Sequence, residues 1–280
     1  MAWTGSLTLA YRSEPLNGAP RTTLRDRHDG PLRVLASLYP EAPAVCHNVL
    51  VHPPGGLVGG DTLGIDITVA PGAHALVTTP GATRFYRSLG APATQALSAR
   101  IEPGARLEWL PLETLAYSGC IGRNSLRFEL APGAEMMGWD LLALGLPASN
   151  LAFERGSFEQ RIELPGRWLE RGVVKANDTR LLDSPLGWAG HRVMATLWFA
   201  AGSALGSERR NGLLEAARDT CNAHVLKATA GTTAVDEAVV VLRVLAPRVE
   251  PAMTLLTQVW AAWRKAAWQL PACVPRVWRT

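Results

Sequence analysis

Apolar residues alternate with small or polar ones along several stretches of the first two-thirds of the chain. Every second residue is apolar in residues 63–69 and 126–130, and Phe158, Ile162 and Leu164 follow the same alternation. Successive side chains of a β-strand point to opposite faces, so this two-residue period predicts strands with one buried and one wet face.

A proline–glycine pair follows four of these stretches at similar intervals. The pairs are Pro71-Gly72, Pro103-Gly104, Pro132-Gly133 and Pro165-Gly166, with successive prolines 32, 29 and 33 residues apart. Proline sets φ at the second turn position and glycine accepts the positive φ that a type II turn needs next. We therefore expect a repeated strand–tight turn–strand hairpin, and a mainly β fold of stacked strands in a β-superhelix-like arrangement. A β-sandwich with hairpins of similar length is the alternative.

The last third of the chain has helical periodicity. Residues 207–222 and 250–268 each place apolar side chains on one face, and residues 238–245 are the β-branched, apolar run of a buried strand. The stripe that contains Trp260 and Trp263 is interpreted as core. No linker rich in glycine, serine or charge divides the chain, so we expect a single domain over residues 1–280 with two helices in its C-terminal third.

The composition indicates a large core and a modest positive charge. Hydrophobic residues make up 48% of the chain, charged residues 19%, and the net charge is +4. The arginines are scattered, which favours solubility over nucleic-acid binding. The four cysteines lie far apart, so free thiols are expected. Without a signal-peptide pattern or an apolar stretch long enough to span a bilayer, we expect a cytoplasmic location.

Residues 55–62 are the nearest resemblance to a phosphate-binding loop. Two glycines have the P-loop spacing and Thr62 ends the stretch, but Asp61 stands where that loop needs lysine, and a strand pattern follows. A carboxylate there would repel phosphate. The chain also has no G-x-S-x-G and no H-E-x-x-H motif. The sequence therefore predicts neither nucleotide binding nor an enzyme.

Two prolines, Pro53 and Pro54, stiffen the chain just before this loop, and four glycines lie between them and Asp61. Glycines let a backbone turn tightly or pack closely against another segment. Such a loop indicates either a tight turn that only glycine can adopt or a carboxylate held in place for a function.

Residues 52–61 resemble the HPPGG-[IV]-VGGD signature of the UreD (UreH) family of urease accessory proteins. This signature loop consists of His52, Pro53, Pro54, Gly55, Gly56, Leu57, Val58, Gly59, Gly60 and Asp61. Residues 78–87 resemble the TTPGATKFYR stretch of that family, residues 107–113 its LEWLPQE element and residues 275–280 its PRIW-x-T ending. The resemblance covers most of the chain.

The resemblance implies a role in the nickel-dependent maturation of urease. Members of the family form a complex with UreF and UreG and dock on apo-urease, and the GTPase activity belongs to UreG. The implied fold is a mostly β superhelical stack with two helices. No tightly bound cofactor is implied. The resemblance also implies that nickel passes through an internal tunnel of the protein. Whether the chain forms a homodimer within the accessory complex is left open.

A transit route should hold nickel weakly, whereas clusters of imidazole and thiolate hold it firmly. Isolated carboxylates are therefore the candidates for metal transit: Asp61, Asp140, Glu170 and Glu113. Each of them could instead be the partner of a nearby arginine. Cys46 and His47 are adjacent, so on one strand they would point to opposite faces and not share a metal.

Arg84, Tyr86 and Arg87 are candidates for partner contacts, with a solvated surface strand as the alternative. Two other functions are alternatives. One is a β-solenoid carbohydrate-active enzyme, in which Asp66 and Glu108 would supply paired acids from neighbouring coils. The other is an interaction module without metal traffic. The family signatures favour the accessory protein.

Overall fold

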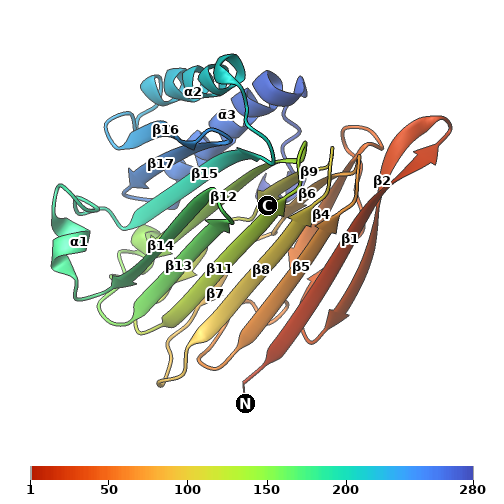
Figure 1. The fold of residues 1–280 in the computed structure, drawn as a ribbon. Coiled ribbons are helices and arrows are strands. Elements are labelled where there is room, and N and C mark those ends of the chain that lie inside the picture. The colour runs from red at the N-terminus through yellow and green to blue at the C-terminus, as the bar shows by residue number, and fades with distance from the viewer. Residues whose placement is uncertain (1, 280) are drawn as a thin grey trace.

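The computed structural model describes residues 2–279, which form two β-sheets stacked face to face with two long helices on the far side of one sheet (Figure 1). Within these residues, one sheet has seven strands in the order β14-β13-β11-β8-β5-β1-β2. Its strands are β1 (Thr4–Leu16), β2 (Ala19–Asp29), β5 (Thr62–Val69), β8 (Ala93–Ile101), β11 (Ile121–Leu130), β13 (Ser157–Leu164) and β14 (Trp168–Lys175).

The second sheet has ten strands within the described part of the chain. Its main order is β16-β17-β15-β12-β9-β6-β4-β3, and β10 pairs with both β12 and β7. The strands are β3 (Arg33–Val34), β4 (Val45–Val51), β6 (His74–Thr78), β7 (Thr83–Phe85), β9 (Arg106–Leu110), β10 (Thr114–Ala116), β12 (Glu135–Leu144), β15 (Val193–Ala201), β16 (Ala230–Asp236) and β17 (Val239–Ala246).

The central strands form a coil in which neighbouring strands of each sheet are parallel. The pairs β5–β8, β8–β11 and β11–β13 are parallel in one sheet, and β4–β6, β6–β9 and β9–β12 are parallel in the other. Each turn of the coil therefore adds one strand to each sheet, which confirms the mainly β, superhelix-like stacking.

The proline–glycine turns adopt the predicted backbone, since Gly72, Gly104, Gly133 and Gly166 all have φ between 70° and 78°. The expectation of one hairpin per unit is wrong for the first three turns. These turns join strands of different sheets (β5 to β6, β8 to β9, β11 to β12), and only the fourth joins the antiparallel pair β13–β14.

The residue after each glycine explains this difference. Ala73, Ala105 and Ala134 follow the first three glycines and are buried, because the chain turns a corner into the second sheet there. Arg167 follows the fourth glycine and is only half-buried. A small residue at this position fits a corner between two packed sheets, while a hairpin at a sheet edge accepts a long polar one.

Both predicted C-terminal helices are present. They are α2 (Ser207–Asn222) and α3 (Val249–Trp268), and a short helix, α1 (Thr179–Asp183), precedes them. The two long helices cover the outer face of the ten-stranded sheet, where Trp260 and Trp263 of α3 are fully buried, as predicted. No helix within residues 2–279 is long and apolar enough to cross a membrane.

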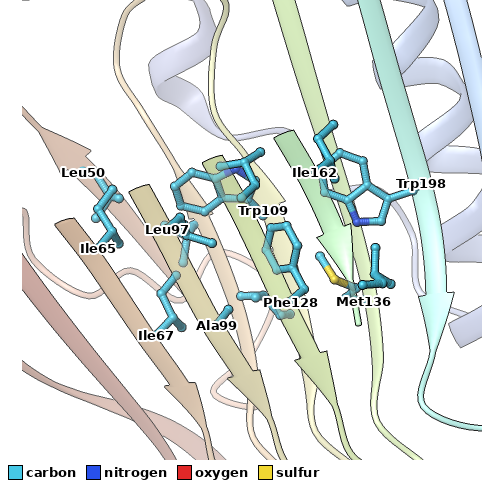
Figure 2. Close-up of a cluster of buried hydrophobic side chains, with 14 of the residues drawn as sticks. Leu50, Ile65, Ile67, Leu97, Ala99, Trp109, Phe128, Met136, Ile162 and Trp198 are labelled. Atoms are coloured by element: carbon cyan, nitrogen blue, oxygen red, sulfur yellow. The ribbon is translucent and has the colours of Figure 1, made fainter. Parts of the chain in front are cut away.

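The main core fills the space between the sheets. Figure 2 shows Ile65 of the seven-stranded sheet beside Leu50 of the other sheet, and Leu97 and Phe128 in the same layer as Trp109 and Trp198. Burial of this apolar surface is the main stabilising contribution to the stack. It also makes any polar side chain in the same layer expensive unless that side chain is paired.

Candidate functional site

The signature loop packs directly against residues 84–91. The Leu57 N–H donates to the Arg84 carbonyl at 2.7 Å, and the Tyr86 N–H donates to the Leu57 carbonyl at 2.8 Å. A Cβ on Gly56 would lie 2.8 Å from the Arg84 carbonyl oxygen and would strike the Tyr86 ring. Glycine is required here for close approach, so the two stretches that carry the family resemblance form one structural unit.

Asp61 fixes this loop. It is 5% exposed, and its carboxylate accepts hydrogen bonds from the main-chain N–H of Trp3 at 2.8 Å and of Val58 at 2.9 Å. The Asp61 charge also acts on His52, where burial lowers the pKa of the imidazole and Asp61 opposes that shift. The geometry thus gives Asp61 the role of a turn anchor, and its role in metal transit stays a prediction.

A cavity of about 240 Å³ opens beside the signature loop. It is lined by His52, Gly55, Arg84, Gln95 and Trp109, among others. The three predicted partner-contact residues differ in their exposure and in their position relative to this cavity. Arg84 lines the cavity. Tyr86 is half-buried with its ring 4.9 Å from that of Tyr117, and Arg87 is exposed. Their contacts with a partner remain predictions.

Three amide side chains cross the inner face of the seven-stranded sheet in register. Gln95 of β8 lies beside Asn124 of β11, which lies beside Gln160 of β13. Asn124 and Gln160 are 3% and 6% exposed. The Gln95 amide donates to the Asn124 side-chain oxygen at 3.3 Å. Because Gln95 also lines the cavity, this series of amides leads from the cavity into the core.

A second series of polar residues crosses the ten-stranded sheet and faces the first. Asp140 of β12 lies in register with Thr196 of β15, which lies in register with Arg243 of β17. The Asn124 amide donates to Asp140 Oδ1 across the two sheets at 3.2 Å. We call Gln95, Asn124, Gln160, Asp140, Thr196, Glu170 and Arg243 together the inter-sheet polar row.

Glu170 closes the outer end of the inter-sheet polar row. It projects from β14, the edge strand of the seven-stranded sheet, and its Oε2 accepts a hydrogen bond from Arg243 Nε at 2.9 Å and a second one from Nη2. Its other oxygen lies 3.5 Å from the Thr196 hydroxyl. The structure therefore brings two of the predicted acids, Asp140 and Glu170, into one site.

The electrostatics of Asp140 are unusual for a carboxylate. Burial and the nearby Glu170 charge raise the pKa of Asp140 from 3.8 to about 7, and the amides of Gln160 and Asn124 oppose this rise. The Gln160 amide is buried and lies close enough to Asp140 to lower the pKa of that acid, but neither its nitrogen nor its oxygen makes a hydrogen bond of ordinary geometry within residues 2–279. A buried acid poised near neutrality beside an unpaired amide is typical of a functional site rather than of a core optimised for stability.

Glu113 lies elsewhere. It lines an open groove of about 670 Å³ between the loop before β10 and the helix α3. Its main-chain carbonyl accepts a hydrogen bond from the Thr83 N–H at 2.9 Å. Within residues 2–279, no hydrogen bond or ion pair links the side chains of Glu113 or Asp61 to Asp140 or Glu170.

A buried ion network beneath α3 was not predicted. Arg264 is fully buried, and its guanidinium lies 2.8 Å from Glu41 and 3.2 Å from Glu108. His47 and His74 bind the remaining oxygens of these two acids at 2.6 and 2.7 Å. Burial raises the pKa of Glu41, but its partners His47 and Arg264 outweigh burial and lower it.

This network settles the orientation of Cys46 and His47. The His47 side chain faces α3 through Glu41, whereas Cys46 belongs to the core between the sheets and donates from its thiol to the Asn48 side-chain oxygen at 3.3 Å. The two residues point to opposite faces, as predicted. Within residues 2–279, no group of three or more His, Cys, Asp or Glu residues is placed to hold a metal ion.

The paired acids of the alternative enzyme do not meet. Asp66 is exposed on the outer face of the seven-stranded sheet. Glu108 is fully buried on the opposite side of the ten-stranded sheet, against α3. Both sheets lie between them, so these residues cannot act on one glycosidic bond, and this pair does not support the alternative of a carbohydrate-active enzyme.

Comparison with known proteins agrees with the sequence signatures. A family model described as UreD urease accessory protein matches residues 4–279. Proteins named urease accessory protein UreD are similar over their whole lengths. The protein of Leptothrix cholodnii is 61% identical over 280 residues, covering all of both chains, and that of Variovorax paradoxus is 59% identical over 280 residues, also covering all of both. That of Polaromonas naphthalenivorans is 58% identical over 278 residues, 99% of each chain. These names describe accessory proteins and not enzymes, in agreement with the predicted non-enzymatic role, and the chain belongs to the UreD family of urease accessory proteins.

Proposed function

We propose that this chain is a cytoplasmic scaffold for nickel insertion into apo-urease, acting with UreF and UreG. We further propose that nickel crosses it along the inter-sheet polar row. The observation that carries this proposal is the continuity of the row. Hydrogen bonds run from the cavity wall at Gln95 through Asn124 to Asp140, and the charge of Glu170 at the surface end acts on Asp140.

The free-energy cost of burying the polar side chains of this row supports a functional role for them. The surrounding layer is apolar, and polar side chains in it need partners to offset their desolvation. Gln160, a member of the row, is buried without a hydrogen bond of ordinary geometry within residues 2–279. An apolar residue of similar volume at this position would leave no polar atoms unpaired, which supports a role of the row other than stability.

The donor set suits a route better than a storage site. The row offers carboxylate, amide and hydroxyl oxygens, which attract a divalent cation but bind nickel less firmly than imidazole and thiolate clusters do. Asp140 and Glu170 supply the negative charge that a cation needs in a medium of low dielectric constant. Asp61 remains a second candidate beside the cavity, with its anchoring role established by geometry.

The experiment for the proposed function is genetic complementation. A urease operon that lacks its own copy of this gene is expressed with this chain, and urease activity and co-purification with UreF and UreG are measured. We expect activity to be restored and the three proteins to purify together. A folded chain that neither restores activity nor purifies with these proteins would contradict the proposal.

A further inference from the structure

The outer end of the inter-sheet polar row has a gradient of exposure. The Arg243 side chain is 49% exposed, the Glu170 side chain is 17% exposed, and Asp140 is 6% exposed. These three residues therefore lie on a path from solvent to the interior. Arg243 is the outermost charged group on this path.

The register of the strands fixes Arg243 at this place. Asp140, Thr196 and Arg243 occupy one line across three neighbouring strands, and Glu170 reaches that line from the opposite sheet. Arg243 donates from Nε and Nη2 to the same carboxylate oxygen of Glu170. The guanidinium therefore occupies the position at which a cation would meet Glu170.

Asp140, by contrast, has no cationic partner within residues 2–279, and the Glu170 charge raises its pKa. The Gln160 amide beside it is 6% exposed and acts on Asp140, but it makes no hydrogen bond of ordinary geometry within the same range. The inner part of the row thus keeps free ligand atoms, while the outer part is neutralised by the arginine.

We propose that Arg243 is the gate at the outer end of this route, an inference that rests on the proposed function. With the guanidinium on Glu170, a divalent cation at Asp140 meets a like charge and cannot use the second carboxylate. When the long, half-exposed arginine side chain moves into solvent, Glu170 becomes free to receive the cation. The guanidinium then returns and competes with the cation for Glu170, so the cation is released instead of being held by both carboxylates.

This arrangement explains how a pair of buried carboxylates avoids trapping its cargo. Without Arg243, Asp140 and Glu170 would face each other with their charge uncompensated, and a divalent cation would be held by both. The gate therefore makes Arg243 a positioning residue, one that acts by occupying Glu170 and not by contacting nickel.

The test measures nickel binding directly. The complex of the full chain with UreF and UreG is dialysed against radioactive Ni²⁺, and the retention and the rate of release to a chelator are recorded. We expect Arg243→Met to retain nickel at least tenfold more tightly and to release it more slowly. Arg243→Lys keeps a positive charge at this position and is expected to restore most of the wild-type behaviour.

A matched control lies on the same strand as Glu170. Arg171 of β14 pairs with Glu159 on the outer face of the sheet, with a side chain 57% exposed. Arg171→Met removes an arginine–glutamate pair of similar form without touching the route, so its nickel retention should equal that of the wild type. Circular dichroism of each variant verifies folding, and Arg243→Gln serves as a second neutral variant should Arg243→Met fold poorly.

The outcomes separate the gate from the route. If the neutral Arg243 variants retain and release nickel as the wild type does, while Asp140→Asn impairs nickel delivery to urease, the gate is wrong and the route survives. If Asp140→Asn and Glu170→Gln also deliver nickel normally, the route fails and the gate fails with it.

Discussion

Asn124 joins the two sheets by donating its side-chain amide to the buried carboxylate of Asp140, at 3.2 Å. The orientation of this amide is fixed from both sides, because its oxygen accepts from Gln95. A hydrogen bond of this kind favours the charged form of Asp140, but burial outweighs it and raises the pKa to about 7. The contact therefore positions an acid that changes charge near physiological pH.

The first prediction concerns the pH dependence of stability. The native pKa of Asp140 lies above its ordinary value of 3.8, so the folded state binds a proton more tightly than the unfolded state does. This contribution to stability is fully present below pH ~4 and is lost as the pH rises through about 7. The difference between 3.8 and about 7 corresponds to a maximum loss of roughly 4 kcal/mol.

Asp140→Asn removes this titration. The free energy of unfolding, measured in denaturant from pH 4 to 8, should fall less with rising pH in the variant than in the wild type. Parallel curves for the two proteins would show that Asp140 does not titrate in this range.

The second prediction concerns the buried ion network beneath α3. Arg264→Met leaves Glu41 and Glu108 buried without their shared cation, and the loss of stability should be roughly 3–5 kcal/mol. Arg171→Met breaks an exposed pair and should cost less than about 1 kcal/mol. Denaturant unfolding compares the free energies of unfolding of the two variants. Equal losses would show that the buried network stabilises the fold no more than an exposed ion pair does.

The third prediction concerns the signature loop. Gly56→Ala places a methyl group 2.8 Å from the Arg84 carbonyl oxygen, so the loop and residues 84–91 must separate, at a cost of about 1–3 kcal/mol. Gly64→Ala in β5 meets nothing within 4 Å and is the control. Thermal unfolding should show a lower Tm for Gly56→Ala only; an unchanged Tm would mean that the loop adapts without loss of stability.

The fourth prediction concerns the thiols. Burial raises the pKa of Cys120 to about 11, and it also raises the pKa of Cys46, Cys221 and Cys273. The first three residues are buried, whereas Cys273 is partly exposed. Because the reagent must reach the sulfur, iodoacetamide at pH 8 should label Cys273 first in the native protein. Mass spectrometry reads the order, and early labelling of Cys120 would contradict the burial shown here.

Much of the fold was predictable because it depends on local patterns. Alternating residues identified β5, β11 and β13, and the Pro-Gly pairs located the turns that follow β5, β8, β11 and β13. The same patterns could not tell whether a turn joins two paired strands or two sheets, because that depends on packing beyond the turn. The alanine after the glycine was the signal that could have decided it.

The candidate site was predictable only in part. Asp140 and Glu170 were selected by the resemblance, but their proximity depends on how β12 and β14 face each other across the core. One local signal was available. Among every second residue from Phe158 to Leu164, the series that includes Ile162, only Gln160 is polar. The Glu41–Arg264 pair joins residues 223 positions apart in sequence, and no local pattern predicts such a contact.

The nickel content of urease tests the central claim most directly. Apo-urease is loaded by the purified accessory complex carrying either the wild-type chain or the double variant Asp140→Asn/Glu170→Gln, and nickel per active site is measured by mass spectrometry. Asp66→Asn, which changes an exposed acid on the outer face, is the control. We predict a loss of nickel in the double variant only, with the complex intact by gel filtration; wild-type nickel content in the double variant would contradict the account.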